Sequence, residues 1–186
     1  MTADVSVQLD GRALAEELVE PTCELYDQAF SRPPFLWTDE ESQHHRELLT
    51  SLKEEPSFGI VTAEASGQLV GFAYGYQLRP DTRWWQSLLE SLPAELTDEW
   101  PGRTFALIDL AVDESWRGKG LGRELTETLL ASRSEQRATL SVQPTATDTQ
   151  DFYVHLGWRK VGRKQMPPGV VSPQFDIYMV ELAPQP

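Results

Sequence analysis

One hexapeptide of this 186-residue chain has residue types suited to phosphate binding, Arg117-Gly118-Lys119-Gly120-Leu121-Gly122. Glycines let a backbone approach a ligand closely and adopt conformations that other residues resist. A helix predicted to begin at Gly120 offers unpaired N–H groups and a partial positive charge at its start. Arg117 and Lys119 add two full positive charges to an otherwise acidic chain. The segment therefore predicts a phosphate cradle at a helix start.

Two common phosphate loops do not fit this hexapeptide. The P-loop pattern G-x-x-x-x-G-K-[ST] is absent from the sequence. The dinucleotide pattern G-x-G-x-x-G fails because Arg123 follows Gly118 and Gly120 at its last position, and no acidic residue lies on a second βαβ strand about 20 residues later. What remains is R-x-x-G-x-G after a strand; the alternative is a glycine-rich turn that binds nothing.

Hydrophobic spacing predicts the elements that position this loop. Alternating or continuous apolar runs indicate strands, and apolar residues at helical spacing indicate helices. Pro21 is expected to kink or restart the first helix, and Thr38-Asp39-Glu40-Glu41 is a capping box. The expected strands are 5–9, 58–65, 69–78, 105–112, 138–142, 158–166 and 175–182, and the expected helices are 12–30, 38–52, 120–133 and 148–156. This order predicts an α/β fold with a mixed central sheet of about seven strands and helices on both faces.

Residues 80–103 form a predicted insertion between the third and fourth strands. Trp84, Trp85, Leu88, Leu89 and Leu92 recur there at helical spacing, which ends at Pro93. The insertion could pack onto the sheet, act as a lid, or form a homodimer surface.

Two further segments resemble a known family. The strand Ile108-Asp109-Leu110-Ala111-Val112-Asp113 precedes the glycine loop, and residues 151–158 contain F-Y-x-x-x-G-W. With R-x-x-G-x-G between them, the pattern resembles the GNAT superfamily of acyl-CoA-dependent N-acyltransferases. It departs from that pattern at Ala146 and Thr149, where the family often has Asn and Ala. The resemblance implies a GNAT-type fold with splayed central strands.

The resemblance also implies how acetyl-CoA is held. Residues 117–122 would bind the pyrophosphate, and the backbone of Leu110, Ala111 and Val112 would pair with the pantetheine arm. A backbone N–H would stabilise the oxyanion of the thioester. Tyr153 occupies the place of the family's general acid; the alternative is a core tyrosine on a short helix. No metal is implied.

The general base is left open. Some family members use a glutamate where this chain has Ala106. Asp109 is the nearest carboxylate, and the run I-D-L-A-V resembles that of aminoglycoside 3-N-acetyltransferases, in which an aspartate is a candidate base. The alternatives are a structural hydrogen-bonding role for Asp109 and a base acting through a chain of waters.

The acceptor is expected to lie under the first helices and the loop after the hairpin. Aromatic rings there could bind a cation by their faces, or could simply pack the insertion onto the sheet. The candidate wall residues are Phe35, Trp37, Tyr74, Tyr76, Trp84 and Trp85. His44 and His45 lie among polar residues, which favours a solvated helix face over catalysis. Arg159, Lys160, Arg163 and Lys164 are expected on an exposed sheet edge.

Composition narrows the class of protein. The formal net charge is −13 with no basic block, which argues against nucleic acid as a partner and favours attraction of cationic amines. Cys23 is the one cysteine, so an internal disulfide is excluded and a packed thiol is expected. Neither a secretory signal nor a membrane-spanning apolar run is recognised, so a cytoplasmic protein is predicted.

The sequence therefore predicts a single domain, residues 1–186, that transfers an acetyl group from acetyl-CoA to a primary amine. The acceptor would be a small molecule or a peptide N-terminus. The alternative is a non-catalytic acyl-CoA sensor on the same fold, since the family's glutamate and asparagine are missing.

Overall fold

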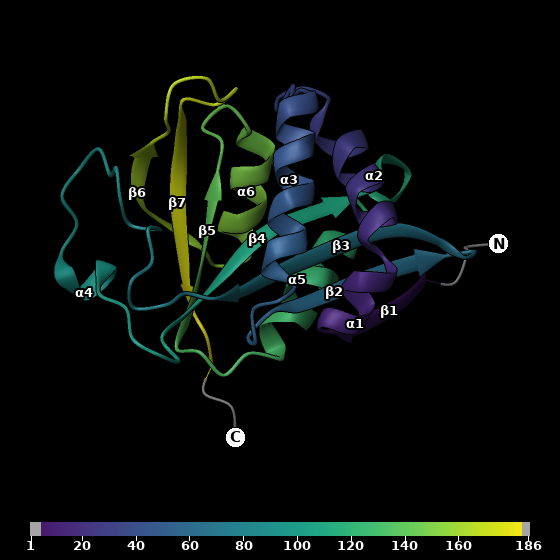
Figure 1. Cartoon of the computed structure of the whole chain (residues 1–186), viewed down its shortest axis with the longest axis horizontal. Coiled ribbons are helices and arrows are strands. Elements are labelled where there is room, and N and C mark those ends of the chain that lie inside the picture. The colour runs from purple at the N-terminus through teal and green to yellow at the C-terminus, as the bar shows by residue number, and fades with distance from the viewer. Residues whose placement is uncertain (1–4, 184–186) are drawn as a thin grey trace. The chain divides into compact units, whose positions relative to one another are not determined.

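The computed structural model describes residues 5–183 and contains one mixed sheet. Its strands are hydrogen-bonded in the order β1-β2-β3-β4-β5-β7-β6, and the α/β class with seven strands is confirmed. The strands are β1 (Val5–Asp10), β2 (Gly59–Ala65), β3 (Gln68–Gln77), β4 (Thr104–Val112), β5 (Arg137–Val142), β6 (Arg159–Gln165) and β7 (Gln174–Glu181). The helices are α1 (Arg12–Glu17), α2 (Val19–Phe30), α3 (Asp39–Leu52), α4 (Ala94–Thr97), the 3₁₀ turn η1 (Glu114–Trp116), α5 (Leu121–Ala131) and α6 (Thr147–His155) (Figure 1).

The chain contacts divide the structure into two compact units. The first unit comprises residues up to Tyr76 together with Leu107–Ser132, and the second comprises Gln77–Ala106 with the residues from Arg133 onward. The first unit thus holds β1 to β3, the end of β4 and helices α1, α2, α3 and α5. The second holds the insertion, the start of β4, β5 to β7 and α6.

Helices cover both faces of the sheet in the first unit. On one face, the side chains of Leu121 and Leu125 in α5 approach so closely that a Cβ added at Gly71 would lie 2.8 Å from Leu125. On the other face, the buried rings of Phe72 and Tyr74 belong to the same core cluster as apolar side chains of α1 to α3. Neighbouring residues of a strand point to opposite faces. Gly71 therefore faces α5, and Phe72 faces the helices on the other side of the sheet.

The first two helices are separated at Leu18, where the backbone leaves helical geometry with φ −107° and ψ 16°. Pro21 therefore lies in the first turn of α2, where a missing N–H removes no intrahelical hydrogen bond. The predicted restart is confirmed. Helix α3 begins with the predicted capping box, since the Thr38 backbone N–H donates to the Glu41 carboxylate at 2.9 Å and the Glu40 N–H donates to Oγ1 of Thr38.

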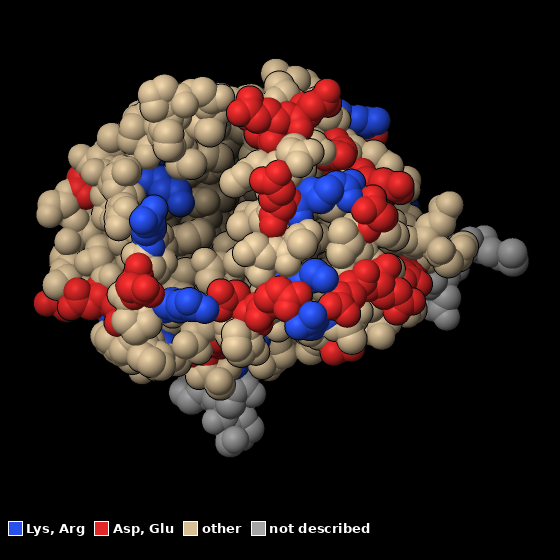
Figure 2. Space-filling view, viewed as in Figure 1, with Lys and Arg blue, Asp and Glu red and all other residues tan. Residues whose placement is uncertain are grey.

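Charged side chains of both signs are interspersed over helices α1 to α3 on the face shown in Figure 2. Arg12 pairs with Glu16 at 2.8 Å, and Lys53 also reaches Glu16 at 3.4 Å. Arg46 of α3 pairs with Glu20 of α2 at 2.5 Å. Such exposed pairs contribute little to stability, so we assign this surface a solubilising role.

In the second unit, β5 runs parallel to the start of β4, in register from Thr104–Arg137 to Ala106–Thr139. Strand β7 pairs antiparallel with both β5 and β6. Helix α6 ends at His155 with Leu156 as its C-cap, and Gly157 follows with a φ of 88°, the conformation expected after a helix C-terminus.

The insertion is not helical over residues 84–92, contrary to the helical spacing of its apolar residues. Turns occupy this stretch, and the backbone pairs with strand β6 instead. The N–H of Leu89 donates to the Arg163 carbonyl at 2.9 Å, and the N–H of Gln165 donates to the Ser87 carbonyl at 2.8 Å. The edge of β6 offers backbone hydrogen-bonding partners to the insertion. The sequence of the insertion alone gives no sign of them.

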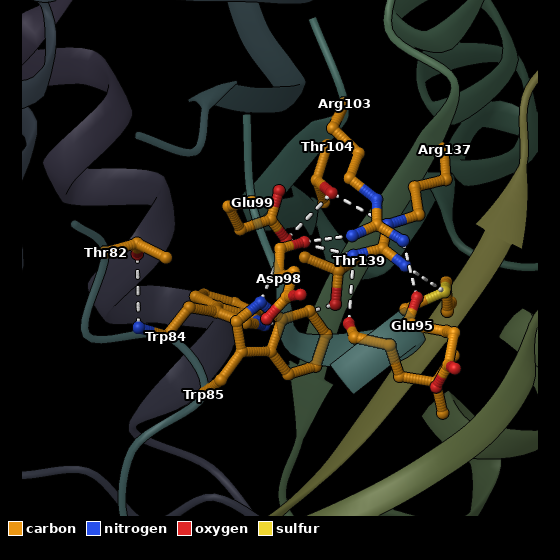
Figure 3. A network of polar contacts seen from close by, with 12 residues as sticks. Thr82, Trp84, Trp85, Glu95, Asp98, Glu99, Arg103, Thr104, Arg137 and Thr139 are labelled. Carbon is orange, nitrogen blue, oxygen red and sulfur yellow. Dashed lines mark hydrogen bonds and ion pairs between the residues drawn. The ribbon is translucent and has the colours of Figure 1, made fainter. Parts of the chain in front are cut away.

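A buried ion pair connects the insertion to β5 (Figure 3). Glu99 accepts a hydrogen bond from Arg137 at 3.0 Å, and their side chains are only 1% and 4% exposed. The same carboxylate accepts hydrogen bonds from Thr104 and from the indole of Trp85, both at 2.9 Å. All three donors reach Oε1 and offset part of the cost of burying this charge, whereas Oε2 is buried without a hydrogen-bond partner within residues 5–183.

Strand β6 is the edge strand of the sheet and Arg159 and Lys160 are exposed, as predicted, but Arg163 and Lys164 are half-buried, which corrects the prediction for these two residues. Lys160 and Arg163 pair with the buried carboxylate of Asp176 on β7, at 2.8 Å and 2.5 Å. Lys164 lies over the ring of Trp84, 4.4 Å from its centroid, and burial lowers its pKa to about 8.

Candidate active site

The glycine loop lies in the first unit, between the end of β4 and α5. Asp113 caps η1 by accepting the Ser115 N–H at 2.9 Å, and residues 117–120 are exposed. Gly118 and Gly120 have φ values of 69° and 87°, so the turn needs glycine at both positions. A Cβ at either glycine would meet nothing within 4 Å. Their role here is therefore conformational, and the space in front of them is open.

Helix α5 begins without a side-chain cap. Its N-cap is Gly120, which has no side chain to accept the first-turn N–H groups. Helix α3 of the same unit is capped by Thr38. Uncapped N–H groups at an exposed, positively polarised helix start are suited to hold a phosphate, and binding of a pyrophosphate by this loop stays a prediction.

The two loop cations are placed differently. Nε of Arg117 donates to the Val112 carbonyl at 2.9 Å, which anchors the guanidinium beside the end of β4. Within residues 5–183, Arg117 has no ion pair with a carboxylate. Lys119 lies over Trp116, with Nζ 4.8 Å from the ring centroid. Both charges can therefore contribute to binding a diphosphate.

The three residues proposed to face the pantetheine arm end β4 in the same unit. Ala111 is buried, whereas Leu110 and Val112 are partly exposed. The Val112 carbonyl already accepts from Arg117, which joins this strand end to the phosphate loop. Pairing of these backbone groups with the cofactor stays a prediction.

Asp109 lies on the same strand and is hydrogen-bonded to Tyr74 of β3. The Tyr74 hydroxyl donates to Oδ2 of Asp109, and Tyr74 is fully buried. Burial raises the pKa of Asp109 to about 6, while the Tyr74 hydrogen bond lowers it. The Asp109 side chain remains 12% exposed, so this carboxylate combines raised proton affinity with residual access. Tyr74 is buried against Asp109 and does not line an open wall, contrary to its predicted place among the acceptor residues.

His45 is a site residue that sequence reasoning missed. The prediction of a solvated helix face holds for His44, which is exposed, but is wrong for His45, which is 2% exposed. Its Nε2 lies 3.7 Å from Oδ2 of Asp109. The sequence contained a signal, since His45 precedes the buried Leu49 by four residues, the spacing of one helix face. Burial lowers the pKa of His45 to about 3, so the ring is neutral near pH 7.

A cavity of about 100 Å³ lies where α2, the following loop and α3 meet. Aromatic rings, two carboxylates and hydroxyl groups line it: Tyr26, Asp27, Phe30, Ser31, Trp37, Thr38, Asp39 and Ser42. We call it the aromatic cavity. Tyr26 forms part of its wall and also stacks on the ring of His45, with centroids 3.5 Å apart and planes inclined by 7°. One side chain thus connects this cavity with the neighbour of Asp109.

The other predicted acceptor residues fall into two groups. Trp37 lines the aromatic cavity, and Phe35 packs on Trp37 and Phe30 at centroid distances of 6.0 and 4.8 Å. Tyr76 ends the β3 portion of the first unit and is partly exposed. Trp84 and Trp85 lie in the second unit, where their indoles donate to Thr139 and Glu99 (Figure 3). These two tryptophans take part in packing the insertion.

Tyr153 lies on α6 in the second unit and is buried. Its ring packs edge-on against Trp158, with centroids 5.6 Å apart, and its carbonyl accepts the Trp158 N–H at 3.0 Å. The proposed acid and base therefore belong to different units. The role of Tyr153 stays a prediction.

Among residues 5–183, no three histidine, cysteine or acidic side chains come together as a metal site. In the same part of the chain, every helix is too short or too polar to cross a membrane. Cys23 is buried, as predicted for a packed thiol.

Comparison with family models matches residues 19–158 to the acetyltransferase (GNAT) family. The chain belongs to this family. The match includes β4, the glycine loop, α5 and the F-Y-x-x-x-G-W segment on which the resemblance depended. A search of curated protein sequences gave no significant match.

Solved structures of GNAT acetyltransferases share the fold. A ribosomal-protein-S18-alanine N-acetyltransferase from Escherichia coli gives a TM-score of 0.66 at 14% identity, covering 98% of this chain and 97% of its own. Aminoglycoside 6′-acetyltransferase type Ii gives 0.67 at 18% identity, covering 97% and 99%. A GNAT acetyltransferase from Staphylococcus aureus Mu50 gives 0.64 at 16% identity, covering 97% and 100%. At these identities the likeness establishes the fold.

Proposed function

We propose that this GNAT protein is an N-acetyltransferase that transfers an acetyl group from acetyl-CoA to a primary amine by direct attack. The observation that carries the proposal is Asp109, a carboxylate with a raised pKa and residual exposure, on the strand that leads into the phosphate loop. An ammonium acceptor with a pKa near 10 must lose a proton before it can attack a thioester. A buried carboxylate with a pKa of about 6 accepts that proton more readily than an ordinary aspartate and is still mostly ionised at pH 7.

The first unit offers the residues to hold the donor. The uncapped start of α5 and the Arg117 guanidinium would bind the diphosphate, and the end of β4 would align the pantetheine arm. The thioester supplies the acetyl group, and its carbon–sulfur bond breaks as the amine nitrogen bonds to the carbonyl carbon. We assign Tyr153 as the acid that protonates the departing sulfur. Cys23 is buried on α2, so no acyl-cysteine step is invoked.

The aromatic cavity supports a cationic acceptor. Ring faces of Tyr26, Phe30 and Trp37 attract cations. Within residues 5–183 neither Asp27 nor Asp39 forms a salt bridge, although the charge of Asp27 acts on Arg46. A volume of about 100 Å³ has room for one ammonium-bearing group. We therefore propose that this cavity binds a positively charged part of the acceptor.

The test is single-turnover cleavage of acetyl-CoA with a panel of amines. The neighbours of this fold include enzymes named for a ribosomal-protein alanine and for an aminoglycoside, so the panel should contain peptides with free N-termini, aminoglycosides and simple diamines. Asp109→Asn should lower the cleavage rate about 100-fold or more, in the range of a lost general base. Glu64→Gln, a carboxylate on β2 remote from this argument, is the matched control.

Two results would contradict the proposal. Tight CoA binding without amine-dependent cleavage would favour the non-catalytic sensor. Full activity of Asp109→Asn would remove Asp109 as the base. Replacing both Asp27 and Asp39 with asparagine should raise KM for cationic acceptors while leaving neutral acceptors unaffected, and an unchanged KM would exclude the aromatic cavity as the acceptor site.

A further inference from the structure

His45 is buried without a hydrogen-bond partner, which is costly for an imidazole. Its side chain is 1% exposed, and neither ring nitrogen makes a hydrogen bond within residues 5–183. Buried polar groups are almost always hydrogen-bonded, and apolar residues fill such positions at lower cost. The rest of the buried face of α3 is apolar, with Leu49 and Leu52. The imidazole therefore calls for an explanation other than packing.

The geometry around the ring directs Nε2 toward Asp109. Tyr26 stacks on one face of the imidazole in nearly parallel orientation, which limits rotation of the ring out of its plane. Oδ2 of Asp109 lies 3.7 Å from Nε2. This separation exceeds the usual N–H···O range of about 2.7–3.2 Å, so a shift of about half an ångström would complete a hydrogen bond.

We propose that His45 is the positioning residue of the base, with its Nε2–H donating to Oδ2 of Asp109 and holding the carboxylate ionised and oriented. The inference rests on the proposed function, because it assigns a task to Asp109. Tyr74 donates to the same oxygen from β3. The two donors approach from different elements, α3 and β3, and would leave Oδ1 of Asp109 to accept the proton of the acceptor.

The proton affinities argue against a relay through His45. Burial lowers the pKa of His45 to about 3 and raises that of Asp109 to about 6. A proton taken from the acceptor would favour Asp109 over His45 by about a thousandfold, since each pKa unit is a factor of ten. The exposures agree, because the Asp109 side chain retains 12% of its surface and that of His45 only 1%. His45 therefore orients the base and does not touch the substrate.

The surroundings contain other titratable groups that the test must separate from His45. Tyr74 and Tyr26 have pKa values raised mainly by burial, so both stay neutral donors over the working range. Arg46 and His44 each lower the pKa of His45 through their charges. Charge interactions with Asp27, Glu41 and Cys23 also raise the pKa of Tyr26.

The test compares pH profiles of kcat/KM for the wild type, His45→Phe and His45→Gln. Phenylalanine keeps a flat ring against Tyr26 but has no donor, and the glutamine amide restores an N–H. A hydrogen bond to the ionised form lowers a carboxylate pKa, so His45→Phe should move the acidic limb upward by about one pH unit. His45→Gln should return it most of the way. His44→Gln, at the exposed neighbouring position, is the matched control and should leave the profile in place.

A second measurement follows the two side chains directly by NMR. Nitrogen NMR of the wild type should show His45 as the Nε2–H tautomer, and carbon NMR of the Asp109 carboxylate should give the same midpoint as the rate profile. The Nδ1–H tautomer, or an unmoved midpoint in a folded His45→Phe, would overturn the positioning role. If Asp109→Asn retained full turnover while His45→Phe still shifted the Asp109 midpoint, the proposed function would fail and the His45–Asp109 contact would stand.

Discussion

The ionised Asp109 carboxylate, which the proposed reaction needs, should lower the free energy of unfolding. Its pKa of about 6 in the folded protein lies above its ordinary value of 3.8 because the charge is buried. The folded state therefore binds a proton more tightly than the unfolded state, and the free energy of unfolding falls as pH rises between these two values. The full difference of about 2.2 pKa units corresponds to about 3 kcal/mol at 1.36 kcal/mol per unit.

Asp109→Asn removes this titration while keeping an oxygen that can accept from Tyr74. The variant should gain less than about 1 kcal/mol near pH 4 and about 3 kcal/mol at pH 7, with little further change above pH 7 because both states are then ionised. Urea unfolding at pH 4, 5, 6 and 7 measures this gain. The exposed Glu24→Gln on α2 is the control and should stay within about 0.5 kcal/mol of the wild type at every pH.

A pH-independent difference between Asp109→Asn and the wild type would refute the reasoning, as would a loss of stability that grows with pH. Either result would mean that the carboxylate is stabilised by its neighbours more than it is penalised by burial. Asp109→Asn should also lose turnover, so a stabilised and inactive protein is the combined signature of a desolvated base.

Three further predictions address other parts of the structure. Arg117→Ala should weaken CoA binding about 10-fold or more by calorimetry, since a charge-assisted hydrogen bond contributes about 1.5–3 kcal/mol, whereas Arg123→Ala on the exposed side of α5 should not; equal affinities would argue against the phosphate cradle. Glu99→Ala should destabilise the protein by about 3–5 kcal/mol in urea unfolding, because it leaves a buried arginine unpaired, and a loss below about 1 kcal/mol would contradict that account. Lys164 should react with acetic anhydride with a midpoint near pH 8 in peptide mass spectrometry, as expected from its pKa of about 8; a midpoint near the ordinary lysine value of about 10.4 would show that Lys164 is not desolvated.

The sequence alone determined the features that depend on a few neighbouring residues. The capping box at Thr38, the restart before Pro21 and the glycine turn at 118–120 were all predictable, since each follows from local hydrogen bonding and backbone conformation. The order of elements along the chain followed from hydrophobic spacing, and the family followed from the motifs around the loop. For the site, the sequence singled out Asp109 as a candidate base on the strand before the loop, and that role stays a prediction.

Only the tertiary structure decided what surrounds Asp109. His45 and His44 are adjacent in the sequence, yet one is buried and the other exposed, because the helix face is chosen by packing against α2 and β3. Tyr74, expected on an acceptor wall, instead donates to Asp109 from a neighbouring strand. The insertion kept helical spacing but paired with β6, because the edge of that strand offered backbone partners. Local patterns predict helix caps, turns and the apolar faces of helices and strands. The partners of a buried charge are set by contacts between segments far apart in the chain.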